Sequence, residues 1–122
     1  MQPDIEIYCK EASLVQLHAW LKSVFEACTE WEKIGQTQRC YCDAVPVILF
    51  ERAVGSWHCL LFDSPLAPWA TDLECAEAAC AALGVEVRCA PGGWQEEQGE
   101  AVADDWLSVT GEGVKQITWR TK

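Results

Sequence analysis

The chain has 122 residues, a length typical of one domain and sufficient for a hydrophobic core without disulfides or a structural metal. Nineteen acidic residues outweigh nine basic ones, giving a formal net charge of −10 and a pI near 4.5. This balance argues against nucleic acid and anionic membranes as partners, and an apolar share of 50% with seven tryptophans excludes a disordered acidic tail.

Targeting and membrane segments are not visible in the sequence. Residues 1–6 lack a basic stretch followed by an apolar one, so we expect no secretory signal. The longest apolar run, Ala78–Val85, is far shorter than the roughly 18 residues that span a bilayer. We therefore expect a cytoplasmic protein with no membrane partner and with reduced cysteines.

The eight cysteines occupy positions typical of small buried hydrophobic residues. Cys9 and Cys89 alternate with apolar residues, whereas Cys28 and Cys80 extend apolar stripes of helical spacing. No C-x-x-C pair occurs, so we expect neither a metal site nor a cofactor. Cys40 and Cys42 form the only close pair, with the neighbouring His58 and Cys59 as further candidates, so a metal bound there is the alternative.

The first half of the chain predicts a strand, a long helix and a β-hairpin. Residues 4–10 alternate with a period of two, as a half-buried strand does. Ser13 and Gln16 fit a capping box that opens a helix ending near Gly35, with a stripe formed by Leu14, Leu17, Leu21, Val24, Cys28 and Trp31. A polar connector, 36–43, precedes a strand at 45–50, which Gly55-Ser56 joins to a return strand at 57–63.

The second half predicts a helix, a strand, an acidic loop and another hairpin. Thr71 and Glu74 form a second capping box, and Gly84 ends the helix that it opens. A strand at 85–89 follows, then an acidic loop at 95–105 and a hairpin of residues 106–110 and 114–120. This order predicts one α+β domain over 1–122, with a ferredoxin-like βαββαβ antiparallel sheet, two helices on one face and an added C-terminal β-hairpin.

The register of the first hairpin makes both faces of the sheet apolar. A turn at Gly55-Ser56 places Val54 opposite Trp57, Arg52 opposite Cys59, Phe50 opposite Leu61 and Ile48 opposite Asp63. Helices can cover only one face, so we expect the other face to form a homodimer interface. The alternative is that Trp106, Val109, Ile117 and Trp119 of the C-terminal hairpin cover it within one chain.

Catalysis finds little support in the sequence, although a cysteine and a histidine from different strands could still pair. His58 and Cys59 are adjacent on a strand and therefore face opposite ways, and His18 lies beside the apolar stripe of the first helix. Nucleophile-elbow, phosphate-loop, zinc-protease and dinucleotide motifs are all missing from the sequence. We expect no catalytic residues, and the balance favours a protein that is not an enzyme.

The distribution of charge suggests a basic protein partner. Residues 53–113 contain eleven of the nineteen acidic residues and a single basic one, Arg88. We expect an interaction or inhibitor module whose acidic surface speeds the encounter with a basic partner, with Trp69 and Trp94 in Pro/Gly loops as anchors. The acidic surface would consist of Asp72, Glu74, Glu77, Glu96, Glu97, Glu100, Asp104 and Asp105.

The alternative function is a small-molecule-binding or enzymatic domain. Its pocket would lie on the second sheet face among Trp57, Cys59, Leu61 and Arg52, with Asp63 at the rim. Arg52 distinguishes the two hypotheses, because an arginine among apolar neighbours could bind an anionic ligand.

Overall fold

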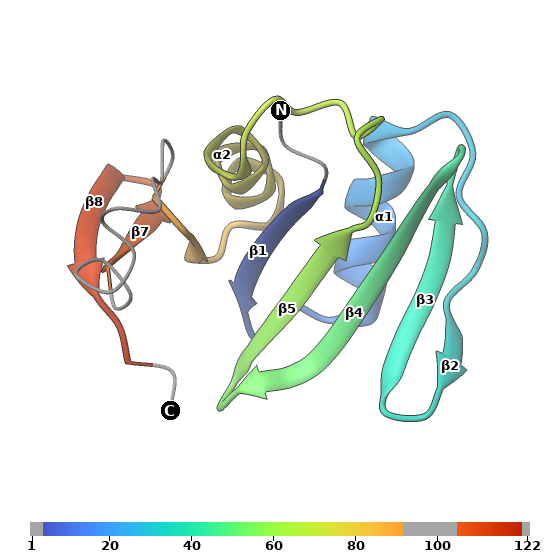
Figure 1. Ribbon diagram of the computed structural model, residues 1–122, viewed down its shortest axis with the longest axis horizontal. Coiled ribbons are helices and arrows are strands. Elements are labelled where there is room, and N and C mark those ends of the chain that lie inside the picture. The colour runs from blue at the N-terminus through green and yellow to red at the C-terminus, as the bar shows by residue number, and fades with distance from the viewer. Residues whose placement is uncertain (1–3, 92–104, 121–122) are drawn as a thin grey trace.

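The computed structural model describes residues 4–91 and 105–120, and the chain there forms two helices and eight strands (Figure 1). In chain order the elements are β1 (Ile5–Lys10), α1 (Leu14–Val24), β2 (Glu32–Ile34), β3 (Thr37–Cys42), β4 (Val45–Val54), β5 (Trp57–Phe62), α2 (Asp72–Leu83), β6 (Val87–Cys89), β7 (Asp105–Thr110) and β8 (Gly113–Thr118).

The described strands make one antiparallel sheet in the order β2-β3-β4-β5-β1-β6-β7-β8. In Figure 1 the β2–β3 hairpin stands at one end of this sheet and the β7–β8 hairpin at the other, with α1 behind β4 and β5. The predicted ferredoxin-like βαββαβ fold is therefore wrong. The molecule has an eight-stranded, mostly antiparallel sheet with only two helices, and both hairpins at its ends belong to that sheet.

Helix α1 is much shorter than its apolar stripe predicts. Its capping box is confirmed, since the Ser13 side chain accepts from the Gln16 N–H and the Gln16 side chain accepts from the Ser13 N–H. The helix ends at Val24, because Phe25 is extended and the Asp43 carboxylate binds the backbone N–H groups of Glu26 and Ala27. Those two hydrogen bonds attach the following segment to β3 rather than to another helical turn.

Residues beyond the helix keep the burial that the stripe predicts, although they are not helical. Cys28 pairs with Cys42 of β3 in an isolated antiparallel bridge, and Trp31 donates its indole N–H to the Leu14 carbonyl at 3.1 Å. Both side chains pack against the core. The predicted polar connector at 36–43 is likewise wrong, because Thr37–Cys42 is strand β3.

Helix α2 agrees closely with its prediction. The Thr71 hydroxyl accepts from the Glu74 N–H, and Gly84 ends the helix in the left-handed conformation, with φ of 71°. The Glu74 carboxylate accepts from the Ala70 N–H, one residue before the position that a capping box would give.

One cluster of buried side chains joins both helices to the sheet. Alternate residues of β1, namely Ile5, Ile7 and Cys9, face this cluster, and we call that side of the sheet the core face. The other side is the open face, on which β1 presents Glu6, Tyr8 and Lys10. The largest fully buried side chain is that of Phe62 on β5, which contacts the rings of Trp20 and Phe25.

The β4–β5 hairpin contains an irregularity that its sequence does not reveal. Val54 pairs with Trp57 as predicted, but Phe50 pairs with Cys59 and Ile48 with Leu61, two residues away from the predicted partners. Three β4 residues, 51–53, therefore stand opposite the single residue His58. This β-bulge takes Arg52 out of the regular strand and away from the side of the sheet on which it was predicted.

Candidate functional site

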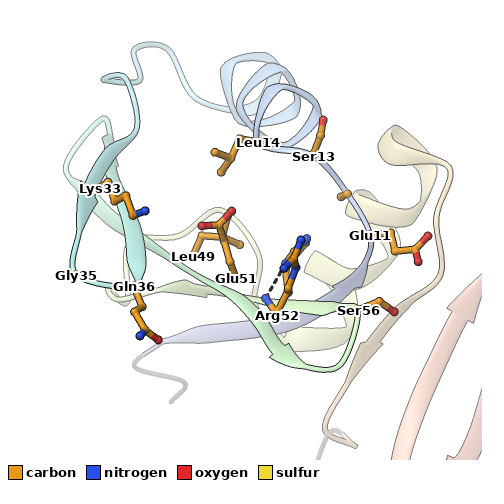
Figure 2. A pocket seen from close by; sticks show the side chains of 12 residues that line it. Glu11, Ser13, Leu14, Lys33, Gly35, Gln36, Leu49, Glu51, Arg52 and Ser56 are labelled. Atoms are coloured by element: carbon orange, nitrogen blue, oxygen red, sulfur yellow. Dashed lines mark hydrogen bonds between the residues drawn. The ribbon is translucent and has the colours of Figure 1, made fainter.

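The cavity at the start of α1 is the candidate functional site. It has a volume of about 680 Å³, within the range of small-molecule sites, and lies between the first turn of α1, the β2–β3 hairpin and the bulged part of β4–β5. We call it the polar pocket. Its lining includes Glu11, Leu14, Lys33, Leu49, Glu51, Arg52 and His58, together with Ala12, Ser13, Gly35, Gln36 and Ser56. In Figure 2, Leu14, Lys33 and Glu51 point toward one another across it.

The β-bulge positions the acidic and basic side chains at one wall of the pocket. Strand residues alternate between two faces, so a regular β4 would place Glu51 and Arg52 on opposite sides of the sheet. Here three β4 residues stand opposite His58, and Glu51, Arg52 and His58 all line the same cavity. The irregularity thus brings Arg52 to the cavity beside Glu51 and His58, which a regular ladder would already place on one side of the sheet.

His58 is held in a single tautomer. Its Nδ1 accepts the backbone N–H of Arg52 at 2.9 Å, and a backbone N–H can only donate (Figure 2). Nδ1 is therefore unprotonated, and neutral His58 carries its proton on Nε2. Burial and the Arg52 charge lower the pKa of His58 below 6.5, while Glu51 and Glu11 act in the opposite direction.

The charged side chains of the pocket do not neutralise one another by ion pairing. Within residues 4–91 and 105–120, Glu11, Lys33, Glu51 and Arg52 form no ion pair, and the only one found there joins Arg88 to Glu86. Two cations and two carboxylates thus line a single cavity. Groups of both signs are free to bind a ligand.

The backbone at two edges of the pocket is strained. Glu11 and Arg52 have φ values of 58° and 52°, a left-handed conformation that is unfavourable for any residue with a Cβ atom. Glu11 is held there by its N–H, which donates to the Ser56 carbonyl at 3.1 Å, and Arg52 by its bond to His58. Such strain clusters at functional sites, where the surrounding structure maintains it.

The arrangement is suited to binding rather than to bond making. His58 has its Nδ1 occupied by a backbone donor, so the ring offers the Nε2–H as a hydrogen-bond donor and no free nitrogen as a base. The pocket's hydroxyls come from Ser13 and Ser56, and the Ser13 hydroxyl caps α1. Cations, carboxylates and the apolar Leu14 and Leu49 side chains remain as the contacts available to a ligand.

A second cluster lies on the open face, where the C-terminal hairpin meets β1 and β5. Tyr8 makes edge contacts with Trp106 and Trp119 at 5.4 Å between ring centroids, and Trp119 lies 5.1 Å from Trp57. The Arg88 guanidinium sits 4.3 Å from the Trp57 ring and 4.7 Å from the Trp119 ring.

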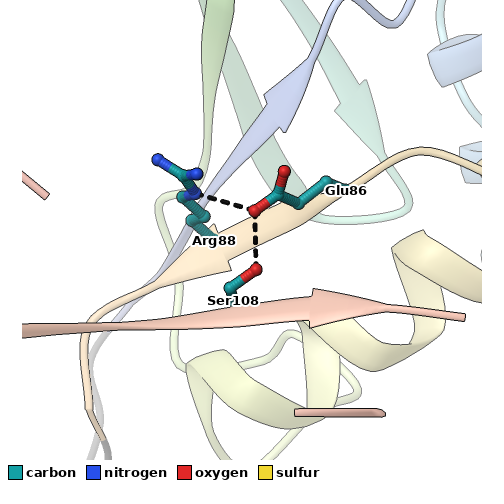
Figure 3. A network of polar contacts seen from close by, with 3 residues as sticks. All are labelled: Glu86, Arg88 and Ser108. Carbon is teal, nitrogen blue, oxygen red and sulfur yellow. Dashed lines mark hydrogen bonds and ion pairs between the residues drawn. The ribbon is translucent and has the colours of Figure 1, made fainter. Parts of the chain in front are cut away.

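Figure 3 shows how this arginine is oriented. The Glu86 carboxylate accepts from the Arg88 Nε–H at 2.9 Å and from the Ser108 hydroxyl at 2.6 Å. These contacts hold the Glu86 pKa below its usual range, although burial acts against them. Trp106 of β7 and Trp119, the residue after β8, thus lie over Tyr8 on the open face, as the single-chain alternative predicts for these two tryptophans.

Of the residues predicted to line a pocket on the second sheet face, Trp57, Cys59 and Leu61 do share the open face of β5, whereas Arg52 lies apart from them. Trp57 packs in the aromatic cluster, and Arg88 rather than Arg52 lies beside it. The Cys59 thiol donates to the Glu6 carboxylate at 3.2 Å. Asp63 is exposed and its N–H donates to the Pro46 carbonyl, whereas Arg52 lines the polar pocket on the far side of the bulge.

Of the two tryptophans predicted as anchors, Trp69 packs against the core. Its ring stacks on Trp20 at 5.6 Å and contacts Phe62 at 5.0 Å and Phe25 at 6.2 Å. These contacts are those of a side chain that covers the core, which is the alternative to a binding anchor for a tryptophan in a loop. Trp94 lies outside the described residues.

The predicted acidic surface is represented by four of its eight residues, since Glu96, Glu97, Glu100 and Asp104 lie outside the described residues. Asp72 is half-buried, its carboxylate accepts from the Glu6 N–H at 3.2 Å, and burial raises its pKa to about 6. Glu74 accepts from the Ala70 N–H, Asp105 is half-buried in β7, and Glu77 is exposed. Two of these four carboxylates thus accept backbone N–H groups within the chain, and the basic-partner hypothesis stays a prediction.

Three further observations concern the cysteines, metal binding and the helices in the described part of the chain. All eight cysteines are free, and six are buried. Among the residues that the structure describes, no group of three or more histidine, cysteine or acidic side chains has a geometry that could hold a metal ion. In the same residues, neither helix has the length and apolar character needed to cross a membrane.

Sequence reasoning missed most of the polar pocket. It singled out Arg52 and His58 but placed them on different faces, and it left Glu11, Lys33 and Glu51 unassigned. The one available signal was the charged sequence Glu51-Arg52 inside a strand whose preceding residues are apolar, because such a break accompanies a bulge.

Comparisons with protein-family models, curated proteins and solved structures give no match.

Proposed function

We propose that the protein binds a small zwitterionic molecule with an apolar body, of the α-amino-acid class, in the polar pocket. The observation that carries the proposal is the presence of two cations and two carboxylates, without ion pairs among the described residues, around one cavity of about 680 Å³. A ligand with one charge of each sign would satisfy both sets at once.

The donors suit the carboxylate of such a ligand. Arg52 and Lys33 carry fixed positive charges, and the neutral His58 ring adds a directed N–H donor. The positive end of the α1 dipole lies at Ser13 and Leu14 on the same wall. These groups together favour an anionic oxygen pair over a neutral one.

The acceptors and the apolar wall suit the rest of the ligand. The Glu51 and Glu11 carboxylates can each accept a hydrogen bond from an ammonium group. A ligand that carries only a negative charge would be repelled by these carboxylates. Leu14 and Leu49 give the ligand's apolar body a surface to pack against. Specificity therefore requires all three parts of the molecule.

Titration calorimetry with three related probes tests this proposal. L-phenylalanine has both charges, its amide lacks the carboxylate and its N-acetyl derivative lacks the ammonium group. We expect heat of binding with the amino acid and at least a tenfold weaker affinity, about 1.4 kcal/mol, with each derivative. Glu51→Gln should weaken the amino acid and leave the N-acetyl derivative unchanged.

Glu77→Gln, an exposed change on α2 away from the pocket, is the matched control and should bind as the wild type does. Equal affinity for the three probes would contradict recognition of a zwitterion. If binding survives in a variant that combines Arg52→Ala, Lys33→Ala and Glu51→Gln, the ligand does not bind in the polar pocket.

The uncovered part of the open face favours a second function, self-association. Trp106 and Trp119 cover Tyr8 and Trp57. By contrast, β2, β3 and β4 leave Ile34, Tyr41 and Phe50 exposed by 48%, 47% and 38%. Arg39 lies among them, and its Nε is buried without a hydrogen-bond partner in the described residues. We propose that this surface pairs with a second copy of the chain.

Light scattering during size-exclusion chromatography tests the second function. We expect the mass of a dimer for the wild type and of a monomer for Tyr41→Glu, because a charge in the apolar interface opposes its burial. Val15→Glu, an exposed change on α1, is the matched control. A wild-type monomer at high micromolar concentration would contradict the dimer and leave the ligand proposal intact.

A further inference from the structure

Three thiols meet where the segment after α1 joins the end of β3. Cys28 and Cys42 are partners in an isolated antiparallel bridge. Cys40 lies on the same face of β3 as Cys42, with 3.9 Å between the two sulfur atoms. Cys40 and Cys42 are buried, whereas Cys28 is half-exposed.

The backbone hydrogen bonds show which kind of pair Cys28 and Cys42 form. The Thr29 N–H donates to the Tyr41 carbonyl at 2.8 Å, and the Asp43 N–H donates to the Ala27 carbonyl at 2.7 Å. Both bonds flank the two cysteines rather than joining them, so this is a non-hydrogen-bonded antiparallel pair. Cα atoms in such a pair are about 4.5 Å apart, inside the range that a disulfide bridges.

The other thiol pair is less suited to a covalent bond, although its sulfur atoms lie close together. Cys40 and Cys42 are two residues apart on one strand, which separates their Cα atoms by about 6.8 Å, the upper end of the disulfide range. Closing that bond would require a local bend in β3. The cross-strand pair requires only rotation of the side chains.

We propose that Cys28 and Cys42 are a reversible oxidation site that forms a cross-strand disulfide with a small disulfide oxidant such as oxidised glutathione. The half-exposed Cys28 reacts first, as its thiolate attacks one sulfur of the oxidant and releases one glutathione thiol. The Cys42 thiolate then attacks the Cys28 sulfur and releases the second glutathione. The two protein thiols lose two electrons and two protons, and the oxidant gains both.

Peptide mapping of the folded, oxidised protein tests the pairing. After incubation with oxidised glutathione, acid quenching and alkylation of the remaining thiols, trypsin separates Cys28 on peptide 23–33 from Cys40 and Cys42 on peptide 40–52. We expect these two peptides to be joined through Cys42, with Cys40 alkylated. A disulfide within peptide 40–52 would overturn the proposal.

Three variants keep the test informative. Cys40→Ser should form the same joined peptide, and Cys28→Ser, a change at a half-exposed position, should form none. Cys42→Ser should leave Cys28 as a stable mixed disulfide with glutathione. Cys80, the other half-exposed cysteine, serves as the internal reference for accessibility. A wild-type protein in which Cys28 and Cys80 both stay as mixed disulfides would contradict the proposal.

The pH dependence of the rate gives a second readout. Burial and the neighbouring Cys42 and Asp43 raise the pKa of Cys28 to about 12, and only Lys22 acts in the opposite direction. The thiolate fraction therefore grows about tenfold with each pH unit below that value. We expect formation of the disulfide to be about tenfold faster at pH 9 than at pH 8, and a pH-independent rate would contradict attack by Cys28.

Discussion

Arg52 combines two features of the polar pocket, a strained backbone and a charged side chain. Its φ of 52° is unfavourable for arginine, and the His58 ring holds it there through the backbone N–H. A glycine at this position would adopt the same conformation without the steric penalty. Stability alone does not explain an arginine there, and its place at the cavity wall does.

Arg52→Gly should therefore raise stability while it removes ligand binding. We expect the free energy of unfolding to increase by about 1 kcal/mol, because relief of the left-handed strain exceeds the entropy that glycine adds to the unfolded chain. Urea unfolding measures this change. Arg52→Ala is the control, since alanine keeps the strain and should lose binding without a gain in stability. A less stable Arg52→Gly protein would contradict the assignment of strain.

His58 should make stability depend on pH. Its pKa is lower in the folded protein than the ordinary 6.5, so the neutral ring contributes stability above pH 6.5 that is lost as the pH falls through the folded pKa. Protonation of His58 would also place a hydrogen on Nδ1, where it would repel the Arg52 N–H. We expect urea unfolding to show the wild type losing stability relative to His58→Gln between about pH 7.5 and about pH 5. A constant difference between the two proteins would show that the ring is not held neutral.

The position at which helix α1 ends depends on Asp43. Its carboxylate accepts the N–H groups of Glu26 and Ala27 at 3.2 and 2.9 Å, while its own backbone turns from β3 into β4 with φ of 55°. The residues after α1 are thereby bonded to the β3–β4 turn. One aspartate fixes both the turn and the position of the Cys28 segment.

Asp43→Ala should lower the free energy of unfolding by about 2 kcal/mol, because two hydrogen bonds to a charged group are lost. Asp43→Asn keeps an acceptor oxygen and tolerates the left-handed conformation, so about half of that loss is expected. Thermal or urea unfolding of the two variants distinguishes them. Equal losses would show that the carboxylate does not hold the segment.

Local signals predicted several elements well. The cap at Ser13, the cap at Thr71, the stop at Gly84 and the turn at Gly55-Ser56 all depend on residues close in sequence, and the structure has each of them. The end of α1 depends instead on Asp43, 17 residues away from Glu26. A continuous apolar stripe cannot reveal such a contact, so the helix was predicted too long and β2 and β3 were missed.

The pocket could not be predicted for a similar reason. The bulge at 51–53 leaves the apolar pattern of β4 and β5 intact, because a shift of two residues keeps Ile48 and Phe50 on the same face as Cys59 and Leu61. Only the positions of Glu51 and Arg52 change. Their meeting with Lys33 of β2 then depends on a strand that the sequence did not predict.

Across the whole molecule, the open face is covered in one part and exposed in another, and the charge is unevenly distributed. Trp106 and Trp119 cover the part around Tyr8 and Trp57, whereas the part around Tyr41 and Phe50 stays exposed. The net charge of −10 does not describe the polar pocket, whose wall carries Lys33 and Arg52 beside Glu11 and Glu51. Ligand binding and self-association therefore use different surfaces, and each can be tested without disturbing the other.

Amide NMR of the ¹⁵N-labelled protein during titration with L-phenylalanine locates the bound ligand residue by residue. The Arg52 N–H is bonded to the His58 ring, so its resonance reports any change at the pocket wall. We expect saturable shifts at Glu11, Leu14, Lys33 and Arg52, with the α2 amides unmoved. Shifts concentrated elsewhere, or none at Arg52 at saturating ligand, would contradict a ligand site in the polar pocket.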